Sequence, residues 1–208
     1  MLQHLHRAYR SLRYGRPVVV VSGLPRSGTS MAMKMLAAAG IPVVADQVRT
    51  ADEDNPKGYF EDERVKDLAA SEDRAWLRQA RGKAVKVISY LLKDLPRENN
   101  YRVIFLRRDL REVLASQEKM LDRRGEANET DDAKMVEIYE SHLWRVDYLF
   151  RKSRHLERLE VQYADVVAEP RREAARIAAF LGGGLDVDEM AAAVDPKLYR
   201  NRRQGEPG

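Results

Sequence analysis

Residues 18–30 read VVVVSGLPRSGTS, and residues 31–39 continue as MAMKMLAAA. The run of valines predicts a buried strand, two glycines bound a tight loop, and the segment that follows is typical of a helix. Such a loop points its backbone N–H groups, and the positive end of the helix, at one anion. Loops that hold the phosphates of ATP have the spacing G-x-x-x-x-G-K-[ST], but here Thr29 replaces the lysine and Arg26 supplies a cation inside the loop. The stretch therefore predicts a site for a phosphate-like anion, rather than for the γ-phosphate of ATP.

Apolar segments alternate with helical patterns along the rest of the chain. The segments expected to form strands are residues 17–22, 41–45, 84–89, 101–106 and 159–163. The segments expected to form helices are residues 31–39, 62–80, 110–121, 132–154 and 170–181. Strands that are apolar throughout suit a parallel sheet covered on both faces. We therefore expect a single α/β domain over residues 1–208, with a helical extension at 1–16 and a flexible tail at 200–208. Its core would be a three-layer, P-loop-type, doubly wound sheet, mostly parallel, of about five strands with helices on both faces.

The composition narrows the class of protein. Of 208 residues 44% are apolar, and 37 basic against 33 acidic residues give a net charge of +4. Interspersed charges of both signs indicate a solvated surface and argue against a nucleic-acid polymer as partner. The lack of cysteine excludes disulfides, thiol catalysis and zinc–cysteine sites. The apolar runs are far shorter than the ~20 residues of a membrane span, and the basic N-terminus does not resemble a secretory signal. We therefore expect a cytoplasmic protein that does not span a membrane.

A second basic motif follows an apolar segment, within residues 103–120 (VIFLRRDLREVLASQEKM). Arg107 and Arg108 come at the carboxyl end of the predicted strand, the edge where α/β sheets bind ligands. Ser116 follows two helical turns later, so that Arg108 and Ser116 could clamp a second phosphate. Arginine pairs after strands and helical serines also occur without any such role.

The two motifs together resemble those of the PAPS-dependent sulfotransferase superfamily, in particular its bacterial members, where PAPS is 3′-phosphoadenosine 5′-phosphosulfate. In that family the first loop holds the 5′-phosphosulfate end of PAPS, and a motif R-[ND]-P-x-D-x-x-x-S holds its 3′-phosphate. The resemblance implies that Arg108 and Ser116 bind the 3′-phosphate, although Leu110 and Glu112 stand where the family has proline and aspartate. The residues implied to bind the 5′ end are Arg26, Ser27, Gly28, Thr29 and Ser30.

Three further stretches agree with the resemblance, which therefore covers almost the whole chain. Residues 55–62 (NPKGYFED) are similar to the N-P-[RK]-G-Y-[FW]-E segment of bacterial members. An element Y-x-D…P…I-x-x-F-L-G begins at Tyr163, which is implied to lie near the adenine. Residues 195–202 fall where the family often has a basic loop over the 3′-phosphate, so that Arg200 and Arg202 are implied to bind there.

Sulfuryl transfer to a hydroxyl needs a base for the acceptor proton and cations for the charge on the leaving oxygen. Many animal members carry a K-x-H arrangement after the third strand, with the histidine as base. Here Lys86 matches the lysine but Ile88 replaces the histidine, which puts a histidine mechanism in doubt. Other branches use glutamate, so Glu61 is the candidate base, with Arg26 and Lys86 acting on the transferring group. The reserve candidates for the base are Asp62, Glu53 and Asp54, and the four histidines are interpreted as structural or surface residues.

Each candidate also has a purely structural interpretation. Arg26 could be a surface residue of a tight turn, and Thr29 and Ser30 could cap the helix. Glu61 could be an acidic residue in the first turn of the next helix, stabilised by the helix dipole, and Lys86 could face solvent. The aromatic residues at helical spacings are interpreted as core packing: Trp76, Tyr139, Trp144, Tyr148 and Phe150.

The sequence thus predicts a sulfotransferase that moves a sulfuryl group from PAPS to a hydroxyl or amine of a small molecule, sugar or lipid, without a metal. A P-loop small-molecule kinase is the first alternative, but Thr29 in the lysine position and the lack of a magnesium-binding aspartate after a strand argue against it. A non-catalytic nucleotide-binding module of the same fold is the second, motivated by the missing histidine. Neither the acceptor nor the oligomeric state can be read from the residues.

Overall fold

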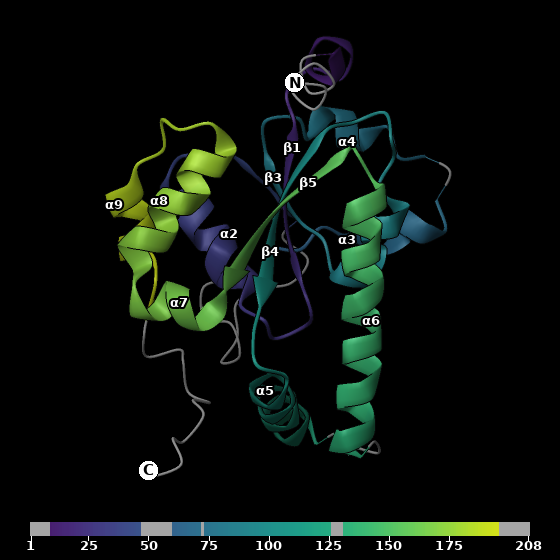
Figure 1. Cartoon of the computed structure of the whole chain (residues 1–208), viewed down its shortest axis with the longest axis vertical. Helices are drawn as coiled ribbons and strands as arrows, with labels where there is room; N and C mark the ends of the chain where they lie inside the picture. Colours follow the sequence, from purple (N-terminus) through teal and green to yellow (C-terminus); the bar gives the residue numbers. More distant parts are fainter. Residues whose placement is uncertain (1–8, 47–59, 72, 126–130, 196–208) are drawn as a thin grey trace.

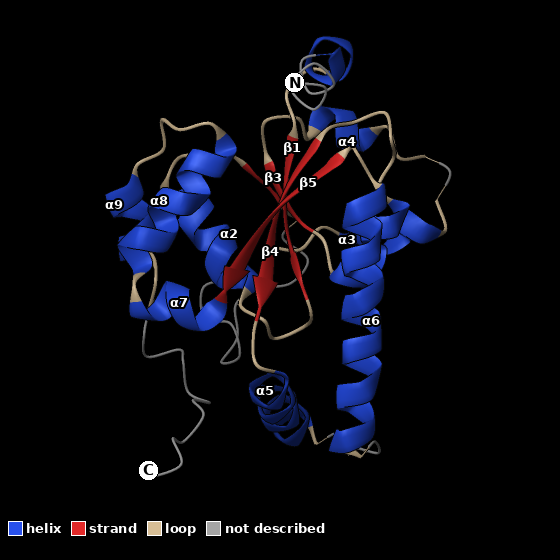
Figure 2. Ribbon diagram, viewed as in Figure 1, coloured by secondary structure: helices blue, strands red, loops and turns tan. Residues whose placement is uncertain are grey.

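The strand that opens the first motif lies at the centre of a parallel sheet. The computed structural model describes residues 9–46, 60–71, 73–125 and 131–195. The strands pair in the order β2-β3-β1-β4-β5, and every pairing between them is parallel (Figure 2). The strands are β1 (Val18–Gly23), β2 (Val43–Val44), β3 (Ala84–Lys86), β4 (Tyr101–Arg107) and β5 (Leu156–Gln162).

Helices cover both faces of this sheet (Figure 1). One layer consists of α2, α8 and α9, and the other consists of α6 with the short segments α3, α4, η1 and η2. The remaining helices, α5 and α7, lie near the carboxyl ends of β4 and β5. The bounds are α2 (Thr29–Ala38), α3 (Glu63–Lys66), η1 (Asp67–Ala69, 3₁₀), α4 (Trp76–Gln79), η2 (Ser89–Asp94, 3₁₀), α5 (Leu110–Arg124), α6 (Asp132–Lys152), α7 (Tyr163–Ala168), α8 (Pro170–Leu181) and α9 (Val187–Ala192).

The valines of β1 are buried alternately on the two sides of the sheet. Val19 and Val21 belong to the core cluster that includes α2, α8 and α9. Val18 and Val20 belong to the cluster on the side of α6. A strand covered on both faces has no solvent side for a polar residue, which explains why the four residues Val18–Val21 are all apolar. The expected α/β fold with helices on both faces of a five-stranded sheet is therefore confirmed.

Some elements differ from those expected. The single helix predicted over residues 62–80 is wrong, because the described residues form α3, η1 and α4 there. The side chains of Ser71 and Asp73 hydrogen-bond the backbone of the intervening turn, and such bonds compete with helix continuation. The strand at the end of the sheet starts at Leu156, three residues before the predicted start, and β3 ends at Lys86 because η2 follows.

The ends of the chain are only partly described. Residues 9–14 are helical, whereas residues 1–8 and the expected tail at 200–208 lie outside the described residues. None of the described helices is long and apolar enough to cross a membrane.

Candidate active site

The two motifs predicted from the sequence meet at one cavity of about 490 Å³. The cavity lies at the carboxyl ends of β1, β3 and β4, the edge at which parallel α/β sheets bind ligands. In Figure 1, β4 points down toward α5, with α2 beside it. The predicted residues that line the cavity are Arg26, Gly28, Thr29, Ser30, Glu61, Lys86, Arg108, Ser116 and Tyr163.

The helix that follows the glycine loop begins without a side-chain cap. Gly28 is the N-cap residue of α2, no side chain hydrogen-bonds the cap, and the first turn contains no acidic residue. Since the first backbone N–H groups of a helix lack intrahelical acceptors and carry the positive end of the dipole, this terminus suits an anion. Thr29 and Ser30 lie in its first turn and line the cavity.

Ser27 is part of the loop, but its side chain does not line the cavity. Its hydroxyl is buried and has no hydrogen-bond partner among the described residues. It packs against Gly23 so closely that a Cβ atom at that glycine would come within 2.3 Å of Ser27 Oγ. The side chain of Ser27 therefore shapes the loop from its inner side.

Gly28 has to be glycine because the ring of Tyr163 covers it. Its φ of 99° lies in the left-handed region, and a Cβ atom there would come within 2.4 Å of Tyr163 Cδ2. The guanidinium carbon of Arg108 lies 4.5 Å from the centroid of the same ring, a cation–π arrangement. Tyr163 is 5% exposed, and burial raises the pKa of its phenol. The ring thus packs against both motifs at once.

Arg26 links the first motif to the second. Its φ of 65° is unusual for a residue with a side chain, and such strain often marks a ligand-binding loop. Arg26 Nε donates a hydrogen bond to Ser116 Oγ at 3.1 Å, and Arg108 Nη1 donates to the Arg26 carbonyl oxygen at 3.1 Å. The loop and the start of α5 are therefore in direct contact, although 90 residues separate Arg26 from Ser116.

Arg108 is held in place by a neighbouring carboxylate. Its Nε lies 3.0 Å from Glu112 Oε2, and the two side chains are 7% and 8% exposed. Asp109 caps α5 by accepting hydrogen bonds from two backbone N–H groups, which fixes the helix that carries Glu112. A guanidinium buried beside a carboxylate keeps a defined direction. Of this pair, Arg108 is the residue that lines the cavity.

Lys86 and Glu61 form an ion pair at the cavity. Lys86 Nζ lies 3.1 Å from Glu61 Oε1 and 3.4 Å from Ser30 Oγ, and the two charged side chains are 10% and 26% exposed. Glu61 precedes α3 and its N-cap residue Asp62, so it is not a first-turn residue of that helix. Asp62 has a structural role, because it caps α3 and pairs with Arg64 at 2.7 Å.

Sequence reasoning missed part of the cavity wall. The additional polar or flexible residues that line it are Lys34, Gln117, Met120 and Tyr139. Lys34 lies one helical turn after Ser30, and Gln117 follows Ser116, so helical spacing from the predicted residues could have found both. Tyr139 Oη donates to Gln117 Oε1 at 2.9 Å, a contact between α5 and α6 that no local pattern indicates.

Several predicted residues lie outside the described part of the chain. They are Glu53, Asp54, Arg200 and Arg202, together with most of the segment 55–62. Within the described residues no cluster of three or more histidine, aspartate or glutamate side chains could hold a metal ion.

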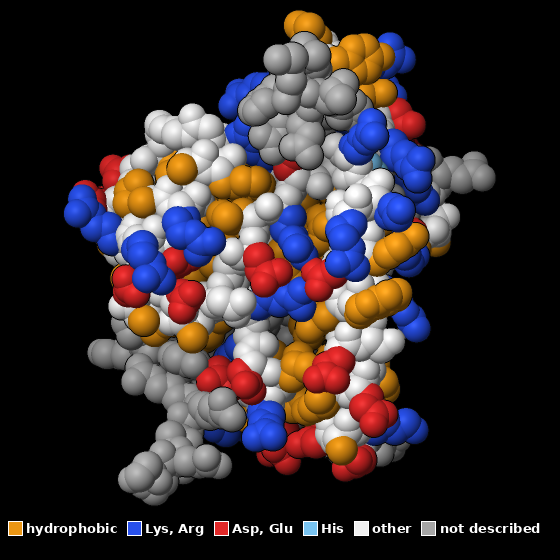
Figure 3. All heavy atoms as spheres, in the orientation of Figure 1, with side chains coloured by type: hydrophobic (Ala, Val, Ile, Leu, Met, Phe, Trp, Pro, Cys, Tyr) orange, Lys and Arg blue, Asp and Glu red, His pale blue; other side chains and the backbone are white. Residues whose placement is uncertain are grey.

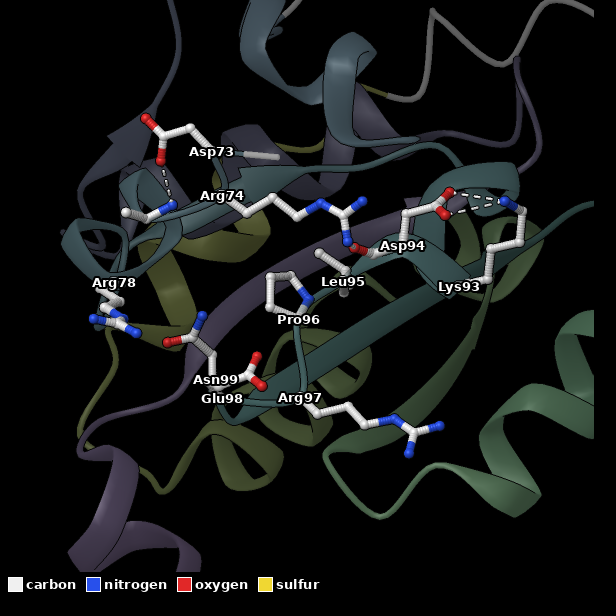
Figure 4. Close-up of a pocket in the computed structure, with 11 residues that line it drawn as sticks. Asp73, Arg74, Arg78, Lys93, Asp94, Leu95, Pro96, Arg97, Glu98 and Asn99 are labelled. Atoms are coloured by element: carbon white, nitrogen blue, oxygen red, sulfur yellow. Dashed lines mark hydrogen bonds and ion pairs between the residues drawn. The ribbon is translucent and has the colours of Figure 1, made fainter. Parts of the chain in front are cut away.

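A larger cavity, of about 720 Å³, lies at the opposite edge of the sheet, between the segments that lead into β3 and β4 (Figure 4). Several of its charged side chains interact with one another or with the backbone. Lys93 pairs with Asp94 at 3.0 Å, and Arg74 extends toward Asp94 and donates to its carbonyl oxygen at 3.2 Å. Asp73 accepts a hydrogen bond from the backbone of Ala75 at 2.9 Å. Because neither sequence motif reaches this edge, the cavity at the carboxyl ends of the strands is the candidate active site.

The chain is similar to known proteins both in sequence and in fold. The model of the sulfotransferase family matches residues 83–189, just over half of the chain, which include Lys86, Arg108, Ser116 and Tyr163. A sulfotransferase domain from the curacin biosynthetic pathway is 12% identical, covers 92% of this chain and 93% of its own, and superposes with a TM-score of 0.53. A sulfotransferase domain from the olefin synthase of Synechococcus PCC 7002 is 17% identical, covers 92% of this chain and 81% of its own, and gives a TM-score of 0.52. At such low identity these two structures show a shared fold. A search among curated protein sequences gave no match.

Proposed function

The chain belongs to the sulfotransferase family, and from this premise we propose that it transfers a sulfuryl group from PAPS to a hydroxyl or amine of its acceptor. The observation that carries the proposal is the single cavity in which an uncapped helix N-terminus, two arginines and the Lys86–Glu61 pair face the same space. A volume of about 490 Å³ lies in the range of small-molecule and cofactor sites.

The residues of the cavity fit a nucleotide that carries an anionic group at each end. We assign the 5′ end to the loop and to the start of α2, where Arg26, Thr29 and Ser30 offer donors next to the helix N-terminus. We assign the 3′-phosphate to Arg108, which precedes α5, and to Ser116, within that helix. When bound, PAPS supplies the sulfuryl group. The leaving group is adenosine 3′,5′-bisphosphate, which departs with the phosphate oxygen that had bridged to sulfur.

Glu61 is the proposed base. Its carboxylate would take the proton of the acceptor hydroxyl while the acceptor oxygen forms a bond to sulfur and the bond from sulfur to the bridging oxygen breaks. Lys86 and Arg26 would stabilise the negative charge that develops on the leaving oxygen. The ion pair between Lys86 and Glu61, at 3.1 Å, supports these roles because it keeps both groups at the same end of the cavity.

The experiment that tests the proposal combines binding and turnover. We expect calorimetry with adenosine 3′,5′-bisphosphate in the presence of EDTA to show binding, and PAPS to be turned over with a panel of hydroxyl and amine acceptors. Glu61→Gln should abolish turnover and leave nucleotide affinity intact. Glu63→Gln is the matched control, because Glu63 is an exposed acid that pairs with Lys66 on α3 and does not line the cavity.

The alternatives predict different outcomes. A strict magnesium requirement together with transfer from ATP would establish the kinase instead. Nucleotide binding without turnover for any acceptor would indicate the non-catalytic module. Failure to bind adenosine 3′,5′-bisphosphate would overturn the proposal as a whole.

A further inference from the structure

Large apolar side chains are exposed together along α6 and the segment that contains η2. Trp144 and Tyr148 were expected in the core from their spacing, and for these two residues that prediction is wrong. Tyr90 stacks on His142 of α6 with ring centroids 3.7 Å apart, so η2 and α6 share one surface. We call this surface the η2–α6 face. Its exposed apolar residues are Ile88 (43% exposed), Tyr90 (38%), Ile138 (43%), Trp144 (64%) and Tyr148 (49%).

Two aromatic rings of this face and a lysine form a row. The rings of Trp144 and Tyr148 stack with centroids 6.0 Å apart and an interplanar angle of 15°. Lys152 Nζ lies 5.7 Å from the Tyr148 centroid. The three residues follow one another at single-turn intervals, which places two aromatic rings and a charged end in one row along the outside of the helix.

The exposed charges on this half of α6 are basic. Between Ser141 and Lys152 they belong to Arg145, Arg151 and Lys152. The acidic residue in that stretch, Asp147, pairs with Arg107 at 2.9 Å and also with Arg158. Figure 3 shows basic and hydrophobic side chains interleaved over the upper part of α6, with most acidic ones nearer its lower end. The exposed acids Glu137 and Glu140 lie in the first half of the helix, so the aromatic rings combine with basic charge only over its second half, around Tyr148 and Lys152.

We propose that the η2–α6 face docks on the surface of an anionic lipid bilayer. Tryptophan and tyrosine favour the boundary between headgroups and acyl chains, where the ring is apolar and its polar edge stays hydrated. Lysine and arginine around them bind the phosphates of anionic headgroups and extend their apolar stems along the same boundary. A hollow of about 610 Å³ lies between η2 and α6, and Trp144, Tyr148 and Lys152 do not line it. This row therefore forms a surface outside the hollow that a flat bilayer can reach.

The same face continues into the candidate active site. Ile88 lines the nucleotide cavity and lies two residues before Tyr90. Tyr139, which also lines the cavity, is next to Ile138 on α6. A docked bilayer would therefore meet the molecule beside the Lys86–Glu61 pair. This identifies the acceptor as a hydroxyl-bearing lipid, a conclusion that rests on the proposed function, whereas docking itself does not.

Flotation with vesicles tests docking directly. The full chain should float with vesicles of equal amounts of phosphatidylcholine and phosphatidylglycerol, should remain unbound with phosphatidylcholine alone, and should dissociate at high salt. The double variants Trp144→Ala/Tyr148→Ala and Arg145→Glu/Lys152→Glu should each weaken binding about tenfold or more. Leu12→Ala is the matched control, since Leu12 is a large apolar residue that is 89% exposed and lies outside the η2–α6 face.

Calorimetry with adenosine 3′,5′-bisphosphate separates failure of docking from failure of the proposed function. Nucleotide binding without vesicle binding would overturn the docking proposal and leave the function in place. Vesicle binding without nucleotide binding would retain docking and remove the lipid as acceptor. Docking would also be overturned by vesicle affinity that the double variants do not change, or by self-association that Trp144→Ala/Tyr148→Ala abolishes, which would assign the face to a second copy of the chain.

Discussion

Arg26 Nε donates a hydrogen bond to Ser116 Oγ at 3.1 Å, and this contact joins the glycine loop to the first helix of the second basic motif. The Arg26 carbonyl oxygen accepts a hydrogen bond from Arg108, so both the backbone and the side chain of Arg26 contact the second motif. Two motifs that are far apart in the sequence thus form one wall of a single cavity, in which both ends of one nucleotide could be bound.

Removal of either arginine should weaken nucleotide binding. We expect Arg26→Ala and Arg108→Ala each to reduce the binding free energy of adenosine 3′,5′-bisphosphate by roughly 1.5–3 kcal/mol, the value of a lost charge-assisted contact. Calorimetry measures this change. Arg111→Ala is the control, because Arg111 is an exposed arginine in the first turn of α5, three residues after Arg108, that does not line the cavity. Parent-like affinity in both variants would show that the nucleotide binds elsewhere.

Arg108→Ala should also destabilise the fold, because it removes the guanidinium that pairs with the buried Glu112 carboxylate. We expect the free energy of unfolding to fall by about 3 kcal/mol, as for other broken buried ion pairs. The double variant Arg108→Ala/Glu112→Ala should recover part of this loss, since it removes the buried carboxylate as well. Urea denaturation of the single and double variants measures both effects. Equal losses of unfolding free energy in the two variants would mean that the Glu112 carboxylate does not destabilise the fold when Arg108 is removed.

Gly28→Ala should be far more harmful than the same change at Gly40. Both glycines have positive φ, 99° and 81°, but a Cβ atom at Gly28 meets the Tyr163 ring at 2.4 Å while nothing lies within 4 Å of one at Gly40. Backbone strain alone costs about 1 kcal/mol, so Gly40→Ala should show this amount and Gly28→Ala about 3 kcal/mol. Urea denaturation provides the comparison, and similar values for the two variants would contradict the close packing of Tyr163 on the loop.

Lys86→Met should reduce turnover of PAPS by about a hundredfold or more, as for the loss of other groups that stabilise developing charge. Lys86→Arg should restore part of the activity, since it returns a cation to the same end of the cavity. Lys83→Met is the matched control, because Lys83 is exposed and lies three residues earlier on the same segment. Steady-state assays with PAPS measure the effect, and an unchanged turnover number in Lys86→Met would exclude a catalytic role for the lysine.

His155 should make the fold less stable at mildly acidic pH. Burial, with Arg10 and Arg97 nearby, lowers its pKa from the usual 6.5 to about 4. Between these two pH values the unfolded chain binds a proton that the folded chain does not, so the free energy of unfolding falls as the pH is lowered from 6.5 to 4. His155 accounts for about 2 kcal/mol of this fall in the free energy of unfolding, a value that is reduced because the side chain is partly exposed.

The variant His155→Gln isolates this contribution. Burial also lowers the pKa of His142, which acts in the same direction, so the parent and His155→Gln are compared over the same pH range by urea denaturation. The variant should show a flatter dependence above pH 4. Parallel curves for the two proteins would mean that His155 is protonated in the folded chain.

Local pattern was enough for the framework of the fold. The valines of β1 alternate between two core clusters, and glycines and small polar residues turn the chain into α2, so the P-loop-type sheet could be predicted from adjacent residues. The single helix predicted over residues 62–80 was wrong because the side chains of Ser71 and Asp73 hydrogen-bond the local backbone there, and such bonds do not change the hydrophobic period.

The sequence by itself determined the sheet, the glycine loop and the residue types that surround it. Only the tertiary structure decided which of these residues meet: Arg26 with Ser116, Glu61 with Lys86, and Tyr163 with Gly28. It also decided that Trp144 and Tyr148 lie outside the core, although their spacing is helical. The physical reason is that local pattern reports backbone geometry and a preference for burial, whereas the packing of strands and helices determines which surfaces become buried and which distant side chains come into contact.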